Sequence, residues 1–307
     1  MKRLALWIVV LIAAAAFGQS APKRPKITGI DHVDFYTTDA AANEKFYAML
    51  GLESFPPVEP GQTARYAVKK QWIGYSPAPD RASTNRMDHV AFRTDDCEEM
   101  RRYLKANGVA VPQSVGTLKL DEHTLERAFK VKDPEGHVIE FVQPPTGVAI
   151  GYEGLSLDPV SRRLIHAGFI VRDRAAEDHF YKDILGFHLY WYGGMHPERT
   201  EWVAMQVPDG TDWVEYMLNQ PANPDRHLEG VMDHISLGVA DIKAAQAKLE
   251  AHGWKEHGEE HAQMGKDGKW QLNLYDPDQT RIELMEFTPK EKPCCSEFQG
   301  THPSEND

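Results

Sequence analysis

Apolar and polar residues follow a pattern that recurs four times along this chain. Each copy opens with a histidine at the head of an apolar, strand-like run, and an aspartate follows seven residues later. A glycine stands twelve or thirteen residues beyond that aspartate. The histidines are His32, His89, His166 and His234, the aspartates are Asp39, Asp96, Asp173 and Asp241, and the glycines are Gly51, Gly108, Gly186 and Gly253. Four such coincidences indicate an internal repeat, which has to be recognised before a fold is predicted.

The third copy shows which elements the pattern predicts. Residues 164–171 are apolar and β-branched, which is typical of a buried strand. Asp173 is placed to cap a helix with an apolar stripe, and Gly186 suits the left-handed position that follows such a helix. Three more strands are predicted over residues 188–192, 201–207 and 212–218. Each copy is therefore expected to form one strand, one helix and three strands, which makes the fold class α+β.

The four copies fall into two pairs. Similar connectors that contain Pro-Asp-Arg join the first copy to the second and the third copy to the fourth. We therefore predict a first domain over residues 27–145 and a second domain over residues 162–288. Residues 146–161, which are rich in proline and glycine, are expected to link them. The polar residues 289–307 predict a disordered tail.

The amino terminus has the layout of a secretory signal peptide. Lys2 and Arg3 precede an apolar run from Leu4 to Phe17 that is short for a membrane span, and small residues follow it. We predict that residues 1–18 are a signal peptide and that the protein is exported, to the periplasm or beyond the cell. An uncleaved membrane anchor is the alternative.

Composition limits the partners of the chain. Its 307 residues, 41% of them hydrophobic, are enough for two domains with real cores. The net charge is −12, and removal of Lys2 and Arg3 with the signal peptide takes it to −14. Because the sequence contains no basic stripe, nucleic-acid binding is disfavoured.

The three cysteines are too few and too unevenly spaced to predict a disulfide framework. Cys97 follows a predicted helix cap and is expected to be an ordinary helix residue. The adjacent Cys294 and Cys295 lie in the predicted tail, with His302 nearby. Such a pair can capture a soft metal as an alternative, but we expect a tail without a fixed role.

The repeats resemble the vicinal oxygen chelate (VOC) superfamily, which includes glyoxalase I, extradiol dioxygenases, methylmalonyl-CoA epimerases and the fosfomycin and bleomycin resistance proteins. The resemblance covers residues 27–288. It is carried by the module starts HVDFYTTD…FYAMLGL and HAGFIVRD…FYKDILGF and by the endings DPEGHVIEF and DPDQTRIEL. It implies four tandem βαβββ modules, arranged as two half-barrel domains that each form a cup around a divalent metal.

The same resemblance implies which residues bind the metal, because family members place ligands on the first and last strands of a module. In the second domain these are His166, Glu215, His234 and Glu283, with a separation of 49 residues in each module. This set suits one Zn, Ni, Mn or Fe(II) ion. The residues themselves support this reading, because a carboxylate within an apolar strand needs a cation, a hydrogen-bond network or a raised pKa.

The first domain has an incomplete set of the same ligands. His32, His89 and Glu140 occupy the corresponding places, but Gly74 stands where the second domain has Glu215. These three residues form either a second metal site or a vestigial half kept for packing, and we expect the second domain to be the working one. Tryptophans that are expected to line its substrate pocket are Trp191, Trp202, Trp213 and Trp270.

The resemblance implies a lyase or isomerase like glyoxalase I, in which Glu215 or Glu283 removes a proton next to a metal-bound carbonyl and the metal stabilises the enediolate. The first alternative is an extradiol dioxygenase with His166, His234 and Glu283 as its iron triad. Against it, Asn273 stands where the dioxygenase signature has a tyrosine. The second alternative is a non-catalytic binding protein of the resistance type.

The expected partner is a small molecule with two vicinal oxygens. No nucleotide cofactor is expected. Four modules in one chain can complete both cups internally, so either a monomer or a homodimer is compatible with the sequence.

Overall fold

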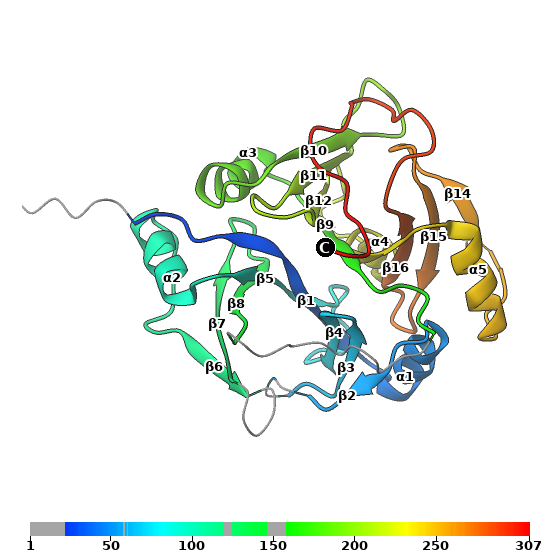
Figure 1. The fold of residues 1–307 in the computed structure, drawn as a ribbon, viewed down its shortest axis with the longest axis horizontal. Helices are drawn as coiled ribbons and strands as arrows, with labels where there is room; N and C mark the ends of the chain where they lie inside the picture. Colours follow the sequence, from blue (N-terminus) through cyan, green and yellow to red (C-terminus); the bar gives the residue numbers. More distant parts are fainter. Residues whose placement is uncertain (1–21, 58, 60, 120–124, 146–157, 259) are drawn as a thin grey trace, which may run out of the picture.

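The computed structural model describes residues 22–57, 59, 61–119, 125–145, 158–258 and 260–307. It contains two mixed sheets of eight strands each, with helices packed on their outer faces (Figure 1). Their strand orders are β2-β3-β4-β1-β5-β8-β7-β6 and β10-β11-β12-β9-β13-β16-β15-β14. The two orders are equivalent, so each sheet is one pair of repeats. The predicted α+β class with four βαβββ modules in two half-barrel domains is confirmed.

The first domain contains modules one and two. Module one consists of β1 (Ile27–Thr37), α1 (Ala40–Met49), β2 (Ser54–Phe55), β3 (Ala64–Val68) and β4 (Gln71–Pro77). Module two consists of β5 (Met87–Thr94), α2 (Cys97–Ala106), β6 (Gly116–Lys119), β7 (Leu125–Lys132) and β8 (Val138–Gln143). Strand β1 runs parallel to β4 and antiparallel to β5, so it joins the two modules at the centre of the sheet.

The second domain repeats this arrangement. Module three consists of β9 (Leu164–Ile170), α3 (Arg174–Asp178) with its π-helical continuation η1 (His179–Ile184), β10 (His188–Gly193), β11 (Trp202–Gln206) and β12 (Trp213–Met217). After a connecting helix, α4 (Arg226–Met232), module four consists of β13 (His234–Val239), α5 (Ile242–Ala251), β14 (Ala262–Met264), β15 (Trp270–Tyr275) and β16 (Arg281–Glu286). Strand β9 is the central strand and pairs with β12 and β13.

The repeated aspartates and glycines perform the local tasks that the sequence assigns to them. The four aspartates cap the module helices, with each side chain accepting a hydrogen bond from a backbone N–H of the first turn. Each of the four glycines ends its helix with a φ between +71° and +98°, a conformation that other residues adopt only at a cost. These caps fix where each chain segment leaves its helix and re-enters the sheet.

The two domains are joined through their central strands. The Gln71 side chain donates to the carbonyl of Leu164 and accepts from its N–H, both at 2.8 Å. Asp212, the counterpart of Gln71 in the other domain, accepts from the N–H of Ile30 at 2.8 Å. Because these side chains are buried, the paired bonds fix one sheet against the other with little freedom to slide.

The carboxyl-terminal residues differ from their prediction, because residues 289–307 are not a disordered tail. This segment (red in Figure 1) packs against β10, where the N–H of Gln299 donates to the carbonyl of Tyr190 at 2.9 Å. Phe298 packs against Tyr190 at 4.8 Å between ring centroids, and Nδ1 of His302 is hydrogen-bonded to the Tyr190 hydroxyl at 2.6 Å. Two aromatic anchors and backbone pairing hold a segment whose overall polarity predicts disorder.

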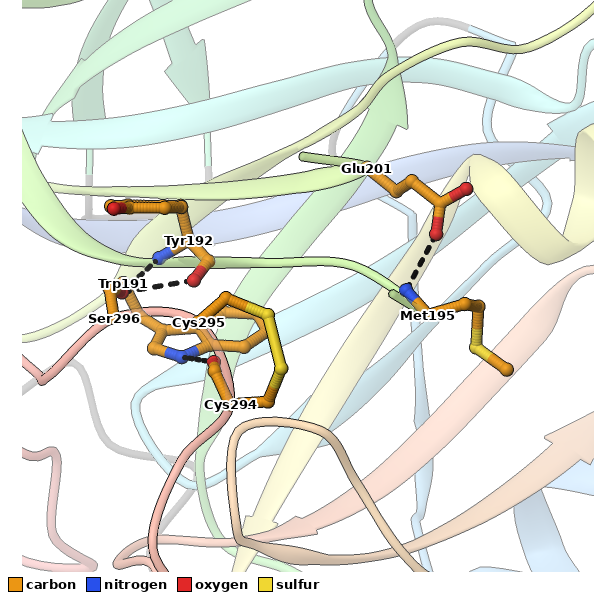
Figure 2. The surroundings of a disulfide bond; sticks show 7 residues. All are labelled: Trp191, Tyr192, Met195, Glu201, Cys294, Cys295 and Ser296. Atoms are coloured by element: carbon orange, nitrogen blue, oxygen red, sulfur yellow. Dashed lines mark hydrogen bonds between the residues drawn. A yellow bond between two sulfur atoms is a disulfide. The ribbon is translucent and has the colours of Figure 1, made fainter. Parts of the chain in front are cut away.

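The adjacent cysteines of this segment form a disulfide (Figure 2). The indole N–H of Trp191 donates to the carbonyl of Cys294 at 3.1 Å, and the Ser296 hydroxyl bonds the backbone of Tyr192. Since both sulfurs are in a disulfide, Cys294 and Cys295 are not thiolate ligands, and the soft-metal alternative is wrong for this state of the protein. Cys97 is the first residue of α2, a helix residue as predicted, and its side chain is buried.

The predicted signal peptide, residues 1–18, and most of the predicted linker lie outside the described residues. Among the described residues, no helix is long and apolar enough to cross a membrane.

Candidate metal centres

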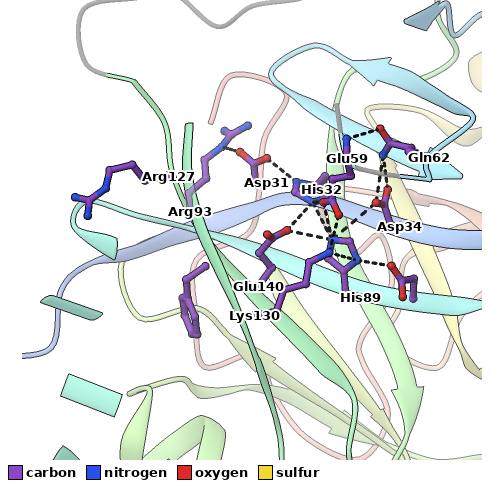
Figure 3. A network of polar contacts seen from close by, with 12 residues as sticks. Asp31, His32, Asp34, Glu59, Gln62, His89, Arg93, Arg127, Lys130 and Glu140 are labelled. Carbon is purple, nitrogen blue, oxygen red and sulfur yellow. Dashed lines mark hydrogen bonds and ion pairs between the residues drawn. The ribbon is translucent and has the colours of Figure 1, made fainter. Parts of the chain in front are cut away.

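The register of the central strands brings His32 and His89 together in the first domain (Figure 3). Their Nε2 atoms lie 3.1 Å apart, and both rings are buried. Glu140 enters from β8, which runs parallel to β5, and its Oε2 lies 3.2 Å from Nε2 of His32 and 3.1 Å from Nε2 of His89. The three residues predicted for this domain therefore converge on one point.

A fourth residue, Glu59, completes this group. Its Oε1 lies 3.5 Å from Nε2 of His32 and 3.3 Å from Nε2 of His89, so that one atom from each of the four side chains falls within 4.8 Å of all the others. The repeat does not predict Glu59 as a ligand, because Glu59 lies between β2 and β3 and not on the first or last strand of a module. The sequence does show that Glu59 is the only acidic residue between β2 and β3, which is the one feature that could have indicated it.

Gly74 is a glycine for a steric reason. It pairs with Asp34 across β1 and β4, and a Cβ at Gly74 would overlap Oδ1 of Asp34. In the second domain the same two places hold Gly168 on β9 and Glu215 on β12, and a Cβ at Gly168 would overlap the ring of His234. Each domain thus has one carboxylate in this cross-strand pair. It is Asp34 on the first strand of module one and Glu215 on the last strand of module three.

Hydrogen bonds behind the two histidines aim them at the centre. Nδ1 of His32 bonds Asp31 at 2.8 Å, and Nδ1 of His89 bonds Asp88 at 2.9 Å. These bonds keep the proton on Nδ1 and leave the Nε2 lone pairs to face Glu59 and Glu140. Oε1 of Glu59 and Oε2 of Glu140 are buried and make no hydrogen bond to any described residue.

Four acceptor atoms that face one another without a donor form a site for a cation. Two neutral imidazoles and two carboxylates carry a charge of −2, which a divalent ion would balance, and this N/O donor set suits Zn, Ni, Mn or Fe(II). The electrostatics agree with this. Burial alone would lower the pKa of His32, but the carboxylates of Asp31, Glu140 and Glu59 raise it well above its usual value, so the cluster attracts positive charge, whether a proton or a metal ion. The residues of this domain fit the metal that the resemblance implies.

The surroundings of the first centre restrain its ligands. The Trp72 ring stacks on His32 with 3.7 Å between centroids and 14° between planes. Lys130 Nζ lies 2.6 Å from Oε2 of Glu59, so the carboxylate is held by its outer oxygen while its inner oxygen faces the histidines. Burial raises the pKa of Asp34 to about 6, although the His89 and His32 imidazoles lower it. Asp34 is a further carboxyl group beside the centre, 3.9 Å from Nε2 of His89.

The second domain brings the predicted ligands together less completely. Nε2 of His166 and Nε2 of His234 lie 3.0 Å apart, and Oε2 of Glu283 is 3.4 Å from the former. These three residues form a compact group. Glu215 lies at its edge, with Oε2 3.5 Å from His234 and 3.9 Å from His166.

Two cations lie within the second cup. Nη2 of Arg281 is 2.7 Å from Nε2 of His234. Lys269 is fully buried, and its Nζ lies 3.2 Å from the Tyr190 hydroxyl and 4.8 Å from the centre of the Trp213 ring. Burial raises the pKa of Glu215 and Glu283 to about 7, while Arg281 lowers both. Burial and Arg281 also contribute to holding the pKa of His234 well below its usual value.

The predicted tryptophans have different roles in the second domain. Trp191 and Trp202 line a pocket of about 90 Å³ that also contacts Glu215, Arg281 and Glu283. Trp213 is buried against His166, with 4.8 Å between ring centroids, and Trp270 packs at the edge of the main hydrophobic core. The pocket therefore involves two of the four tryptophans.

Comparison with known families identifies the fold. The family model described as the Glyoxalase/Bleomycin resistance protein/Dioxygenase superfamily matches residues 29–141 and 163–284. The chain belongs to this superfamily. No curated protein matches its sequence.

Similar solved structures include a ring-cleaving dioxygenase and a glyoxalase. An extradiol ring-cleaving dioxygenase from B. fuscum is 18% identical with a TM-score of 0.63, over 91% of this chain and 76% of that one. The Mn(II)-bound glyoxalase from Novosphingobium aromaticivorans is 16% identical with a TM-score of 0.62, over 90% of this chain and 86% of that one. At these identities the similarity shows a shared fold.

Proposed function

We propose that this VOC protein is a divalent-metal-dependent lyase or isomerase that works from the first domain. The observation that carries the proposal is the convergence of His32, Glu59, His89 and Glu140 on one point without a donor between them. This differs from our expectation that His166, Glu215, His234 and Glu283 form the working site, because the second cup contains Arg281 and Lys269. The substrate class is a small molecule with two adjacent oxygens.

A metal held by these four residues would bind the substrate oxygens and stabilise the negative charge that develops on them. We assign proton transfer to Glu59. It comes from a connecting loop, so it can change position more easily than Glu140, whose strand is paired on both sides. Burial raises the pKa of Glu59, but the neighbouring imidazoles of His32 and His89 outweigh this and keep the pKa below its usual value. Lys130 contacts the outer oxygen and favours the ionised form that accepts a proton.

Extradiol ring cleavage is the second candidate, because the chain shares its fold with a ring-cleaving dioxygenase over 91% of its length. His32, His89 and Glu140 would then be the iron triad of the first domain. Glu59 argues against this candidate, because it occupies a fourth position that oxygen would need. Oxygen consumption with catechols, by the protein reconstituted with Fe(II), would favour it over proton transfer.

The non-catalytic alternative is disfavoured on similar grounds. Four ionisable side chains gathered in a buried position are costly to keep without a bound cation. A binding protein of the resistance type has no need of them.

The experiment that tests the proposal measures metal by mass spectrometry on protein purified without a histidine tag. We expect about one equivalent per chain, and we expect a His32→Ala, Glu140→Ala variant to lose it. The matched control is His166→Ala, Glu283→Ala, which should keep the metal. If the control loses the metal and the first variant keeps it, the working centre lies in the second domain and the proposal is wrong.

A second variant tests the role of Glu59. Glu59→Gln keeps an oxygen ligand but cannot accept a proton, so we expect it to retain part of its metal affinity and to lose nearly all turnover. The assay screens the loaded protein for exchange of the proton next to the carbonyl of α-hydroxycarbonyl compounds in deuterated water. Turnover that survives Glu59→Gln would assign the base to another residue.

We also propose that the protein is exported. The support is the layout of residues 1–18, and amino-terminal sequencing of the mature protein tests it. An exported enzyme meets little glutathione, so screening is best begun with substrates that lack it.

A further inference from the structure

We propose that Arg281 replaces the metal in the second domain, so that this cup keeps the VOC ligand residues but is closed to a divalent ion. The inference goes beyond the proposed function, which concerns the first domain. It rests on three observations: the contact of Arg281 with a ligand nitrogen, the counterpart of Arg281 in the first domain, and the balance of charge in the two cups.

The first observation is that Arg281 contacts the nitrogen of His234 that a metal ion would need as a ligand. Nη2 of Arg281 lies 2.7 Å from Nε2 of His234. A guanidinium can only donate, so Nε2 of His234 must accept. The other nitrogen of the ring supports this assignment, because Nδ1 of His234 lies 2.7 Å from the carbonyl of Met232, to which it can only donate. The lone pair that would bind a metal is therefore engaged by an arginine of the same chain.

The second observation is that the first domain lacks this arginine. Arg281 stands two residues before Glu283 on β16, and alternation along a strand puts both side chains on the face that looks into the cup. The residue two places before Glu140 on β8 is Val138, which has no polar group to offer. The same repeat position thus supplies no donor to the first centre and a guanidinium to the second.

The third observation is the charge within each cup. In the second cup the acidic residues Glu215, Glu283 and Asp267 share the space with two cations, Arg281 and Lys269. In the first cup Lys130 contacts Glu59, and the further acidic residues Glu140 and Asp34 lie beside the histidines. The counterpart of Lys269 in the first domain is Glu126, which is buried and acidic. A divalent ion would neutralise the pair Glu59 and Glu140 in the first cup. In the second cup it would add two positive charges beside a buried ammonium and a guanidinium, at close range and in a medium of low dielectric constant.

The histidines of the second cup also differ from those of the first in what holds them. Nδ1 of His166 makes no hydrogen bond to any described residue, whereas both Nδ1 atoms of the first centre are bonded to aspartates. Nδ1 of His234 is held by the carbonyl of Met232, so among the described residues no carboxylate orients either histidine of the second cup.

The test uses a background that reports on the second domain alone. In a His32→Ala, His89→Ala protein we expect no bound zinc after incubation with ZnCl₂ and gel filtration. Adding Arg281→Val, which copies Val138 of the first domain, should raise the content to about one equivalent, and adding His234→Ala to that protein should abolish it. Arg281→Met is a second variant that keeps the aliphatic packing but has no donor, and it should behave like Arg281→Val.

The control is Arg174→Met, at an exposed position on α3, which should leave the background without zinc. About one equivalent of zinc in the background that keeps Arg281 would overturn the proposal. So would the absence of any gain in folded Arg281→Val and Arg281→Met proteins. This outcome is distinct from a failure of the proposed function, which would appear as a wild-type protein without metal in the first domain.

Discussion

Asp31 and Asp88, which are hydrogen-bonded to Nδ1 of the two histidines of the first centre, are expected to affect its metal affinity. Asp88 accepts from Nδ1 of His89 and is also bonded by the Tyr36 hydroxyl, so its charge makes the ring a better ligand. We expect Asp88→Asn to lower metal affinity about 10- to 100-fold with the fold intact. Competition with a chromophoric chelator measures this. The control is Asp233→Asn, because Asp233 precedes His234 but accepts from the N–H of Ile170. Equal loss in both variants would contradict the assignment.

Individual ligands could be predicted from the sequence only where the repeat places them. His32, His89 and Glu140 follow from the repeat, and they meet because each lies on a central strand whose partners are fixed by the topology. Glu59 could not be predicted in this way, since a loop residue reaches the centre through the path of the chain and not through strand periodicity. The place of Arg281 in the repeat, by contrast, could be predicted from the sequence. Its contact with His234 could not, because that contact depends on the conformation of the side chain, which periodicity does not specify.

At the scale of strands, the pairing of Asp34 with Gly74 restricts what each can be. A Cβ at Gly74 would overlap Oδ1 of Asp34 and press on the Gln62 side chain, both of which are buried. We expect Gly74→Ala to destabilise the protein by about 1–3 kcal/mol through overpacking. Urea unfolding measures the change. Gly116→Ala on β6 is the control, because its new Cβ would lie no closer than 3.2 Å to another residue. If Asp34 is the obstacle, Asp34→Gly should recover part of the loss.

The elements themselves were largely predictable, because they depend on local chemistry. The capping aspartates, the left-handed glycines and the apolar runs all act within about a dozen residues of chain. The carboxyl-terminal segment shows where this fails. Its polarity predicts disorder, but Phe298 and His302 contact Tyr190, more than a hundred residues earlier. A few long-range aromatic contacts can order a segment that composition alone would leave unfolded, and no local pattern reveals them.

The interface between the domains contains an acidic cluster whose ionisation should make the stability of the whole molecule depend on pH. Glu177 of α3 is fully buried, accepts from the N–H of Glu135 in the other domain at 3.0 Å, and lies near Asp133 and His137. Burial and then the charge of Asp133 raise its pKa to about 8, although His137 opposes this. The folded protein therefore holds a proton on Glu177 that the unfolded chain releases at a pH of about 4.3.

The raised pKa of Glu177 determines whether the free energy of unfolding should rise or fall with pH. A folded pKa above the unfolded one means that the contribution of Glu177 to stability is fully present below a pH of about 4.3 and declines until the pH passes about 8. The decline amounts to about 1.4 kcal/mol per pH unit at most. Glu177→Gln keeps the shape but cannot ionise, so its free energy of unfolding relative to the wild type should rise steadily between pH 5 and pH 8. Urea unfolding at several pH values measures both proteins. A difference that stays constant over this range would mean that Glu177 is already ionised in the folded state and that the interface tolerates its charge.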